Sequence, residues 1–319
     1  MTLHTSPTFK DAIEAASEAM KLRPAFIEKD YWVTQILQNL SRSEYVNNVV
    51  FKGGTSLSKA YNLIKRFSED VDLAVIPQTG LSQDKLKKLL KDIETKISEG
   101  LTMIEEGKIR KGRNRSSNYD YPKIFTDNGP LKKEITIELN AFTNPVPHQM
   151  VAIESYLSQF LRSANRMDVI SAHDMDSFSI NVLSLERTFF EKLLSLNRLS
   201  YEGSGKLKEK IRHFYDLHQL YHSEALKLTI LQPQSHQVLS LVLQDDHAIA
   251  TFDGPWKGKP LAASPLFAGL EVNWKEVTPT YTSELSELIW EGELPKPQDV
   301  LEVFKLIKEF LKSFDKEKK

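Results

Sequence analysis

The chain has 319 residues, of which 40% are hydrophobic and 27% are charged, so it can bury one large core or two ordinary ones. Its 42 basic and 43 acidic residues leave a formal net charge of -1, which excludes a general electrostatic attraction to nucleic acid or to an anionic membrane. Because the chain has no cysteine, disulfides and thiolate metal sites are excluded as well.

The N-terminal stretch MTLHTSPTFKDAIEAASEAM lacks the basic region and apolar run of a secretory signal. No segment approaches about 18 uncharged apolar residues, which is the length that a membrane-spanning helix needs. We therefore expect a cytoplasmic protein without a membrane partner.

The first part of the chain mixes helices and strands. Apolar residues recur at helical spacing over residues 7–40, which predicts two helices. The stretch NNVVFKGGTSLSKAYNLI then predicts a short buried strand, a glycine turn and a helix over about 56–65, and EDVDLAVI predicts a second strand. Residues 81–101 predict a Lys-rich amphipathic helix with a solvated face, and residues 102–142 predict further strands.

The second part reads as mainly helical. The two prolines of FTNPVPHQ suggest a boundary, so that residues 1–147 would form an α+β domain and residues 148–319 a helical C-terminal lobe. Helical spacing is found at 184–199, 206–222, 224–243, 282–291 and 297–314. A long loop rich in Pro and Gly, over 251–274, separates the third of these helices from the fourth.

Gly53 and Gly54 stand where the first strand leads into a helix. Glycines let the backbone approach a ligand closely, and the first N–H groups of a helix attract an anion such as phosphate. Thr55 and Ser56 would add hydroxyl donors. A purely structural alternative stays open, in which the glycines make a tight turn and one hydroxyl caps the helix.

Asp70 and Asp72 follow shortly after the glycines, at alternate positions of the predicted second strand. Both carboxylates would then project from one face, roughly 7 Å apart. Mg²⁺ typically binds one or two carboxylates together with substrate phosphates, and two metal ions can clamp an in-line phosphoryl transfer. Asp174 and Asp176 have the same spacing but no glycine turn before them, and we interpret them as loop residues.

Glu138 is the candidate for a third metal-binding carboxylate. In LKKEITIELNAF the alternation puts Glu138 on the face opposite Ile137 and Leu139. The alternative is an ordinary exposed strand acid.

The composite GGTSLSKAYNLIKRFSEDVDL resembles the DNA polymerase β-like nucleotidyltransferase superfamily, in which a glycine turn with Ser or Thr precedes a pair of aspartates. It resembles more closely the AbiEii/AbiGii toxin family of type IV toxin–antitoxin and phage-defence systems. The stretches IEKDYWVTQIL, ERTFFEKLLSLNRL and IRHFYDLHQL agree with that family too. Together these stretches span most of the first 220 residues.

The resemblance implies a nucleotidyltransferase-like mixed sheet with flanking helices, followed by a helical lobe that contributes to the active site. It implies catalytic roles for Ser68, Asp70, Asp72, Lys192 and Asp216, and metal ligation by Asp70 and Asp72. The residues expected to bind the nucleotide are Gly53, Gly54, Thr55, Ser56, Arg66, Ser68 and Lys192. In the last of these motifs the family commonly has Arg-Asp before Tyr-Asp, whereas this chain reads RHFYD, with His213 in the middle. The resemblance therefore implies no role for His213.

Lys192 and Asp216 can also be interpreted from their neighbours. Apolar residues nearly encircle Lys192 on its helix, so its ammonium either snorkels from the core or projects into a polar cleft. It could bind a triphosphate, or it could pair with Glu191 or another surface acid. Asp216 could be a structural acid paired with Arg212, or it could fix Lys192 or activate an acceptor hydroxyl.

The stretch KIRKGRNRSSNYDYPK is the strongest basic cluster of the chain, and it is interleaved with Tyr119 and Tyr121. Such a pattern suits contact with a nucleic-acid backbone and unstacked bases, although a charged hairpin edge is an equal alternative. The residues of this predicted patch are Lys108, Arg110, Lys111, Arg113 and Arg115.

These observations lead to one main hypothesis, a nucleotidyltransferase that uses Mg²⁺ or Mn²⁺ and an NTP and releases pyrophosphate. The acceptor would be RNA, with the 3′ end of tRNA as a candidate, or a protein, and the resemblance implies a toxin with a cognate antitoxin. Two alternatives stay open. One is a nucleotide-binding regulatory module without transfer, and the other is a kinase-type phosphoryl transfer.

Overall fold

The computed structural model describes residues 2–77, 80–127, 129 and 132–318. The chain forms two compact units. The first, called the sheet unit below, comprises Met1–Asn62 and Phe67–Leu183, and the second, the helical unit, comprises Leu63–Arg66 and Ser184–Lys319. The short stretch Leu63–Arg66 thus belongs to a different unit from the residues on either side of it.

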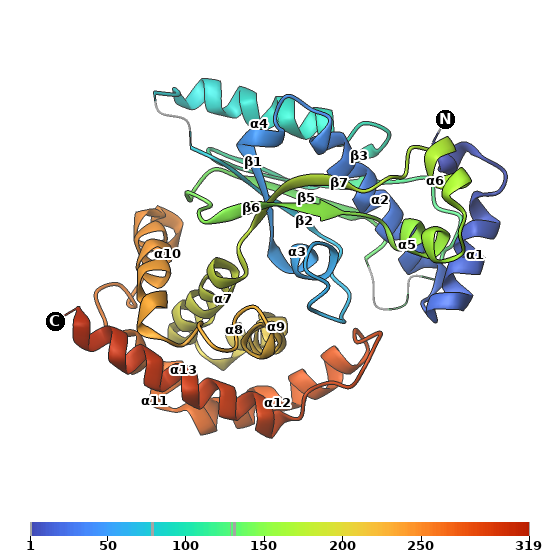
Figure 1. The fold of residues 1–319 in the computed structure, drawn as a ribbon. Coiled ribbons are helices and arrows are strands. Elements are labelled where there is room, and N and C mark those ends of the chain that lie inside the picture. The colour runs from blue at the N-terminus through green and yellow to red at the C-terminus, as the bar shows by residue number, and fades with distance from the viewer. Residues whose placement is uncertain (1, 78–79, 128, 130–131, 319) are drawn as a thin grey trace. The chain divides into compact units, whose positions relative to one another are not determined.

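The sheet unit is built on one mixed sheet (Figure 1), whose seven described strands follow the order β3-β4-β5-β2-β1-β7-β6. The pairs β1–β7 and β2–β5 are parallel and the other neighbours are antiparallel. The strands are β1 Val49–Lys52, β2 Val71–Val75, β3 Thr102–Lys111, β4 Asn114–Asp120, β5 Ile135–Asn140, β6 His148–Ile153 and β7 Phe178–Leu183.

Helices α2 and α4 contact each other, and they also contact β7 and β5, respectively. Arg115 of β4 pairs with Glu94 of α4 and lies opposite Leu139 of β5, so α4 lies over the face that carries Leu139 and the other buried apolar residues of β5. The side chains of Asp72 and Glu138 belong to the other face. The helices of this unit are α1 Phe9–Met20, α2 Pro24–Ser41, α3 Gly53–Lys59, α4 Gln83–Ile97, α5 Tyr156–Ser163 and α6 Met167–Ala172.

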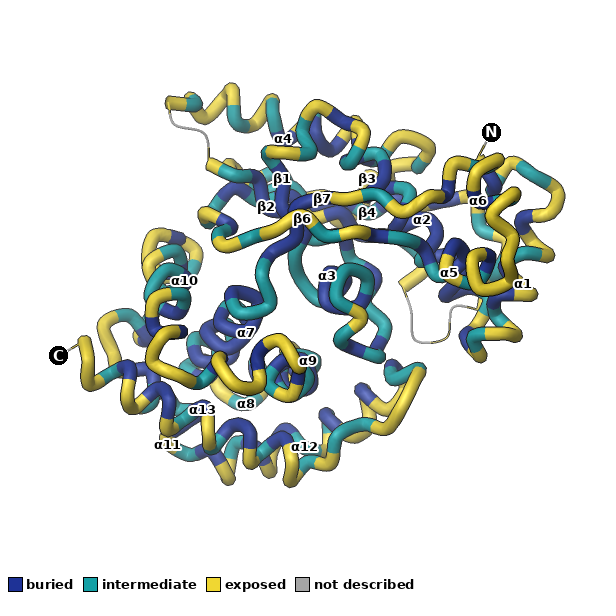
Figure 2. The backbone as a smooth tube through the Cα atoms, viewed as in Figure 1, coloured by how far each residue is buried: buried dark blue, intermediate teal, exposed yellow. Residues whose placement is uncertain are grey.

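Burial follows this arrangement (Figure 2): β1 and β2 lie in the middle of the sheet and are mostly buried, whereas the edge strand β6 is mostly accessible. The face under α4 includes Leu73, Ile135, Ile137 and Leu139, none of which is exposed. The predicted alternation of β5 is confirmed for its apolar face, while on the opposite face Thr136 is buried and Glu138 is exposed.

The units divide at a different place from the boundary expected at residues 147 and 148. After that point β6 and β7 still belong to the sheet, and β7 pairs with β1 at its centre. Neither strand was predicted, because the accessible edge strand β6 has no clear alternation, with three of its residues exposed, and β7 is defined by its pairing with β1. The structure therefore keeps residues up to Leu183 in the sheet unit.

The helical unit packs its helices without a sheet. Helix α7 contacts α9 and α10, and α9 also contacts α12 and α13. Aromatic side chains fill its core, as in the stack of Phe214 on Phe304, whose ring centroids are 4.8 Å apart. The helices are α7 Leu185–Leu199, α8 Ser204–Glu209, α9 Ile211–His222, α10 His236–Ala248, α11 Pro265–Ala268, α12 Leu270–Ser286 and α13 Pro297–Glu317. No helix in the described ranges is long and apolar enough to cross a membrane.

Several helix predictions need correction. The helix expected over 56–65 is α3, which begins at Gly53 and ends at Lys59, since Leu63–Arg66 joins the helical unit. The helix expected over 206–222 is broken at Lys210, and the one over 224–243 begins only at His236, after a turn at Pro233. Helix α12 begins inside the predicted long loop, at Leu270, and tolerates Pro279 within it.

Candidate active site

The junction between β1 and α3 is shaped around Gly53. This residue has a φ of +79°, a conformation that glycine adopts without strain. A methyl group added to Gly53 would lie 2.0 Å from Oδ2 of Asp72. Only a residue without a side chain therefore lets the backbone and the Asp72 carboxylate approach this closely. Gly54 follows within α3.

Thr55 and Ser56 are buried, and their hydroxyls have partners within the protein. Thr55 Oγ1 donates to the main-chain oxygen of Asp70 at 2.6 Å and lies 3.0 Å from Oγ of Ser68. Ser56 Oγ donates to the main-chain oxygen of Gly53 at 2.9 Å. Thr55 thus fixes the segment that carries Ser68 and Asp70, and Ser56 closes the first turn of α3.

Asp70 directly precedes β2 and is partly exposed, and Lys132 donates to its Oδ1 at 3.1 Å. Asp72 lies within β2 in parallel register with Glu138 of β5, so these two side chains share one face. Within the part of the chain that the structure describes, no three Asp, Glu, His or Cys side chains gather closely enough to hold a metal ion. Glu138 therefore stays a predicted ligand rather than a member of a closed cluster.

The donor set nevertheless fits a divalent cation of the Mg²⁺ type. Mg²⁺ is usually held by one or two carboxylates and completed by water and substrate phosphates, so it needs no all-protein cage. Asp70 and Asp72 supply two such carboxylates. A methyl group at position 53 would collide with the Asp72 carboxylate. Because Gly53 has no side chain, the space that this arrangement needs stays open.

A buried ion pair involves the residue that directly precedes Asp70 in the chain. Lys29 of α2 donates to Glu69 and, at 2.6 Å, to the main-chain oxygen of Lys132. The Glu69 carboxylate accepts the main-chain N–H of Lys132 at 3.1 Å to Oε2 and 3.2 Å to Oε1. Burial lowers the pKa of Lys29, and the neighbouring Glu69 opposes this shift. Glu69, the residue next to the candidate metal ligand, is thus held through its side chain to the main chain of the segment before β5.

A second group of charged side chains is assembled within the helical unit. Asp216 of α9 accepts hydrogen bonds from Arg66 Nε at 2.8 Å and Arg66 Nη2 at 2.6 Å, and Lys192 Nζ of α7 is 2.8 Å from its Oδ2. All three residues are buried. Burial alone would raise the pKa of Asp216, but the two cations outweigh it and hold the pKa well below its usual range.

This cluster bears on the alternatives left open for Lys192 and Asp216. Lys192 pairs with the buried Asp216, as the hypothesis that Asp216 fixes Lys192 predicts. Arg66, which is distant from Asp216 in the sequence, also pairs with this carboxylate. Arg66 was predicted only as a nucleotide-binding residue. Arg66 stands two residues before Ser68 in the chain.

His213 lies on the same helix as Asp216, and its buried Nδ1 has no hydrogen-bond partner among the residues that the structure describes. Burial, reinforced by the nearby Lys192 ammonium, lowers the pKa of His213 well below its usual value. The imidazole is therefore neutral at physiological pH. Nothing in its contacts assigns it a part in a reaction.

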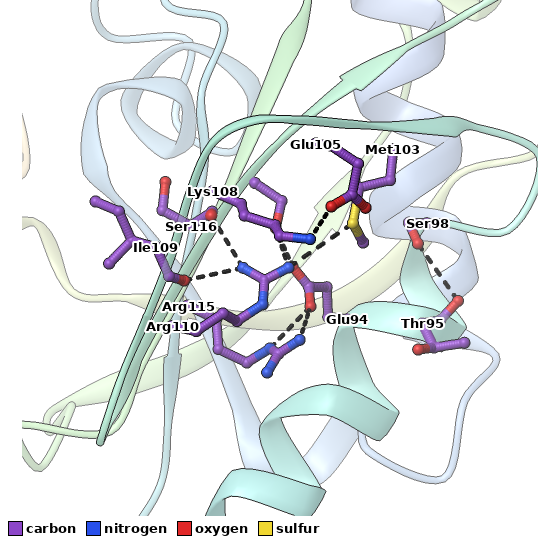
Figure 3. A network of polar contacts seen from close by, with 11 residues as sticks. Glu94, Thr95, Ser98, Met103, Glu105, Lys108, Ile109, Arg110, Arg115 and Ser116 are labelled. Atoms are coloured by element: carbon purple, nitrogen blue, oxygen red, sulfur yellow. Dashed lines mark hydrogen bonds and ion pairs between the residues drawn. The ribbon is translucent and has the colours of Figure 1, made fainter.

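The basic hairpin of β3 and β4 is largely committed to internal contacts (Figure 3). Arg110 and Arg115 both reach the buried Glu94, with Arg115 Nε 2.8 Å from Oε2 and Arg110 Nη2 3.2 Å from Oε1. Lys108 pairs with Glu105. Tyr119 and Tyr121 are buried, so they are not available to stack on bases. Lys108, Lys111 and Arg113 are the members of the predicted patch that stay exposed, and Arg110 and Arg115 are only partly accessible.

The sequence analysis missed the residues that support Asp70. Lys29, Glu69 and Lys132 were not selected, although Glu28, Lys29 and Asp30 interrupt an otherwise uncharged helix. Charged residues at such positions are almost never buried unless they are paired, and this signal could have pointed to Lys29. In the structure Glu28 accepts the main-chain N–H groups of Ile124 and Phe125.

A strand, a glycine-started helix and paired aspartates on a mixed sheet are the features expected of a nucleotidyltransferase. The family model described as "Nucleotidyl transferase AbiEii toxin, Type IV TA system" matches residues 35–303. The chain therefore belongs to the AbiEii family of nucleotidyltransferase toxins of type IV toxin–antitoxin systems.

A solved structure agrees with this assignment at the level of the fold. MenT4, a nucleotidyltransferase toxin from Mycobacterium tuberculosis H37Rv, is similar with a TM-score of 0.60 at 16% sequence identity. The similarity covers 94% of this chain and 89% of that one. No curated protein matches the chain.

Proposed function

We propose that this nucleotidyltransferase moves a nucleotidyl group from an NTP to an RNA acceptor, with release of pyrophosphate and with the help of Mg²⁺ or Mn²⁺. The observation that carries the proposal is the approach of Asp72 to Gly53, beside the partly exposed carboxylate of Asp70. This arrangement supplies acidic ligands next to a backbone that a phosphate can approach.

Asp70 and Asp72 would hold the divalent cation, and Glu138 is the next carboxylate in register. When bound, such a cation neutralises phosphate charge and orients the substrate. The chain itself would position the NTP through the backbone at Gly53 and Gly54 and through the hydroxyl of Ser68. Thr55 would keep Ser68 and Asp70 in place.

We assign Lys192 to phosphate binding and Asp216 to positioning. Asp216 is fully buried, its carboxylate is held by two cations, and its pKa is lowered, so it is poorly suited to accept a proton at neutral pH. Its contacts suit a residue that fixes the Lys192 ammonium and the Arg66 guanidinium. Both cations would then be ready to neutralise negative charge on the nucleotide.

The biological role follows from the family. We propose that the protein acts as a cytoplasmic toxin whose effect a cognate antitoxin counters, and that the 3′ end of tRNA is its acceptor. Lys108, Lys111 and Arg113, which are exposed on the hairpin, are the residues of the predicted patch that can still contact a nucleic-acid backbone.

The test is a transfer assay with wild type and Asp70→Asn. Each protein is incubated with Mg²⁺, total RNA and each NTP labelled at the α-phosphate, and label is followed in RNA and in protein. We expect label in one RNA class with the wild type and a loss of at least about 100-fold with Asp70→Asn, because a preorganised electrostatic group is removed. Asp174→Asn, which changes an exposed loop acid of the same DxD spacing, should behave as wild type.

The other outcomes separate the alternatives. If the α-label is not transferred but an NTP labelled at the γ-phosphate transfers its label, with release of a nucleoside diphosphate, the proposal would be replaced by a kinase. Nucleotide binding without any transfer would replace it by a regulatory module. Label in protein rather than RNA would keep the transferase and correct the acceptor.

A further inference from the structure

The ammonium of Lys132 occupies a position next to the candidate metal ligand Asp70. Its Nζ lies 3.1 Å from Asp70 Oδ1, in a pair whose side chains are 50% and 34% exposed. Pairs this accessible contribute little to stability and open easily. A divalent cation that binds Asp70 would compete with this ammonium directly, since both need the same carboxylate.

The main chain of Lys132 is held much more firmly than its side chain. Its N–H is bound by Glu69 and its C=O by Lys29, and these two residues form an ion pair whose side chains are only 4% and 7% exposed. Burying an ion pair is rarely a gain in stability over apolar residues, so it is better explained by the geometry it imposes. The geometry imposed here keeps the base of the Lys132 side chain beside Asp70 while its tip can move.

We propose that Lys132 is a nucleotide-binding residue, which pairs with Asp70 in the nucleotide-free protein and turns onto the triphosphate when a divalent cation binds Asp70. This inference rests on the proposed function, since it deepens the description of the same site. The triphosphate is the group that the displaced ammonium suits, because it brings several negative charges to the cation that Asp70 holds. Lys29 and Glu69 are then positioning residues that act through Lys132.

The experiment compares metal binding and nucleotide binding in the full chain. Binding of Mn²⁺ to the nucleotide-free protein is measured by the electron paramagnetic resonance signal of free Mn²⁺, and binding of ATP, GTP, CTP and UTP by calorimetry with Mn²⁺ present. The variants are Lys132→Ala, Lys132→Arg and, as a matched control, Lys133→Ala, which changes the next exposed lysine.

We expect the two affinities to change in opposite directions. Lys132→Ala should bind Mn²⁺ about threefold more tightly, because the competing ammonium is gone, and the preferred NTP about tenfold more weakly, because a charge-assisted contact is lost. Lys132→Arg should bind the NTP within about threefold of wild type, since it keeps the charge, and Lys133→Ala should change neither affinity by more than about twofold.

Three results would overturn the inference. If Lys132→Ala changes neither affinity, the contact with Asp70 is an ordinary surface pair. If it weakens Mn²⁺ binding as well, Lys132 supports the local fold rather than the nucleotide. If the wild type itself binds neither Mn²⁺ nor any NTP, the proposed function is wrong. The wild-type measurements alone show this, without any variant.

Discussion

At the scale of single residues, Asp216 is a fully buried carboxylate of the helical unit that pairs with two buried cations. Removing its charge while keeping its size leaves the buried Arg66 and Lys192 without the carboxylate that accepts from both. We expect Asp216→Asn to lower the free energy of unfolding by about 3–5 kcal/mol, as is typical when one partner of a buried ion pair is removed. Urea denaturation of the purified variant measures this loss.

Glu284→Gln is the matched control, because Glu284 is an exposed acid of the same unit, and it should stay within about 0.5 kcal/mol of wild type. An Asp216→Asn variant that unfolds at the same urea concentration as wild type would show that the cluster is not held together as described. A second variant that replaces all three charged residues by apolar ones separates stability from catalysis. It should recover most of the stability, as buried ion clusters elsewhere do, and stay inactive.

Single-residue chemistry was the part of the site best suited to sequence-based prediction. Asp70 and Asp72 could be selected because a glycine-started helix precedes them at short range. Lys132 could not be selected, since its contact with Asp70 joins residues 62 positions apart. Arg66 was selected for the nucleotide, but its pairing with Asp216 spans 150 positions and depends on how the helices pack.

At the scale of elements, Glu94 ties helix α4 to the β3–β4 hairpin. Its buried carboxylate accepts from Arg115 and Ser117, and Arg110 is a third partner (Figure 3). We expect Glu94→Ala to detach the hairpin locally, so that the amides of β3 and β4 exchange hydrogen faster while those of β1 and β7 keep their protection. Hydrogen–deuterium exchange read by mass spectrometry on the native protein gives this comparison.

Glu105→Ala serves as the control, because Glu105 is an exposed acid on β3 that pairs with Lys108. It should leave exchange in the hairpin unchanged. Equal protection of β3 and β4 in wild type and Glu94→Ala would mean that strand pairing alone holds the hairpin and that the network adds nothing measurable.

Elements with a strong internal pattern were predicted well, and elements defined by their neighbours were not. Helices α7 and α13 agree closely with the periodicity, as do the buried positions of β5. Strands β6 and β7 were missed, because their strand conformation depends on pairing with neighbouring strands and is not marked by an alternating pattern of apolar residues. The basic hairpin was recognised as strands, but the buried acid that neutralises it lies on α4 and is invisible in the local sequence.

At the scale of the whole molecule, several histidines share one electrostatic property. Burial is the leading cause that lowers the pKa of His4, His213, His218 and His247, and for His218 the pKa falls to about 4. The unfolded chain takes up these protons near pH 6.5, whereas the folded chain does so only at lower pH. The unfolded state therefore binds more protons below pH 6.5, and stability falls as the pH falls.

We expect the thermal unfolding midpoint to decrease steadily between pH 6.5 and about 4 and to change little between pH 7 and 8. His218→Gln, which cannot titrate, should flatten part of this decrease. Differential scanning calorimetry of both proteins across the pH range makes the comparison. A variant curve parallel to that of wild type would show that His218 does not contribute to the pH dependence.

Because the stretch Leu63–Arg66 belongs to the helical unit, two distant parts of the gene encode that unit. During synthesis Arg66 is made 150 residues before Asp216, the carboxylate it binds in the finished protein. A nascent chain cannot assemble the charged cluster of Arg66, Lys192 and Asp216 until residue 216 has left the ribosome. The order of translation thereby delays the completion of a toxin's charged cluster until most of the chain has been made, and a fragment that begins at Ser184 would never complete it.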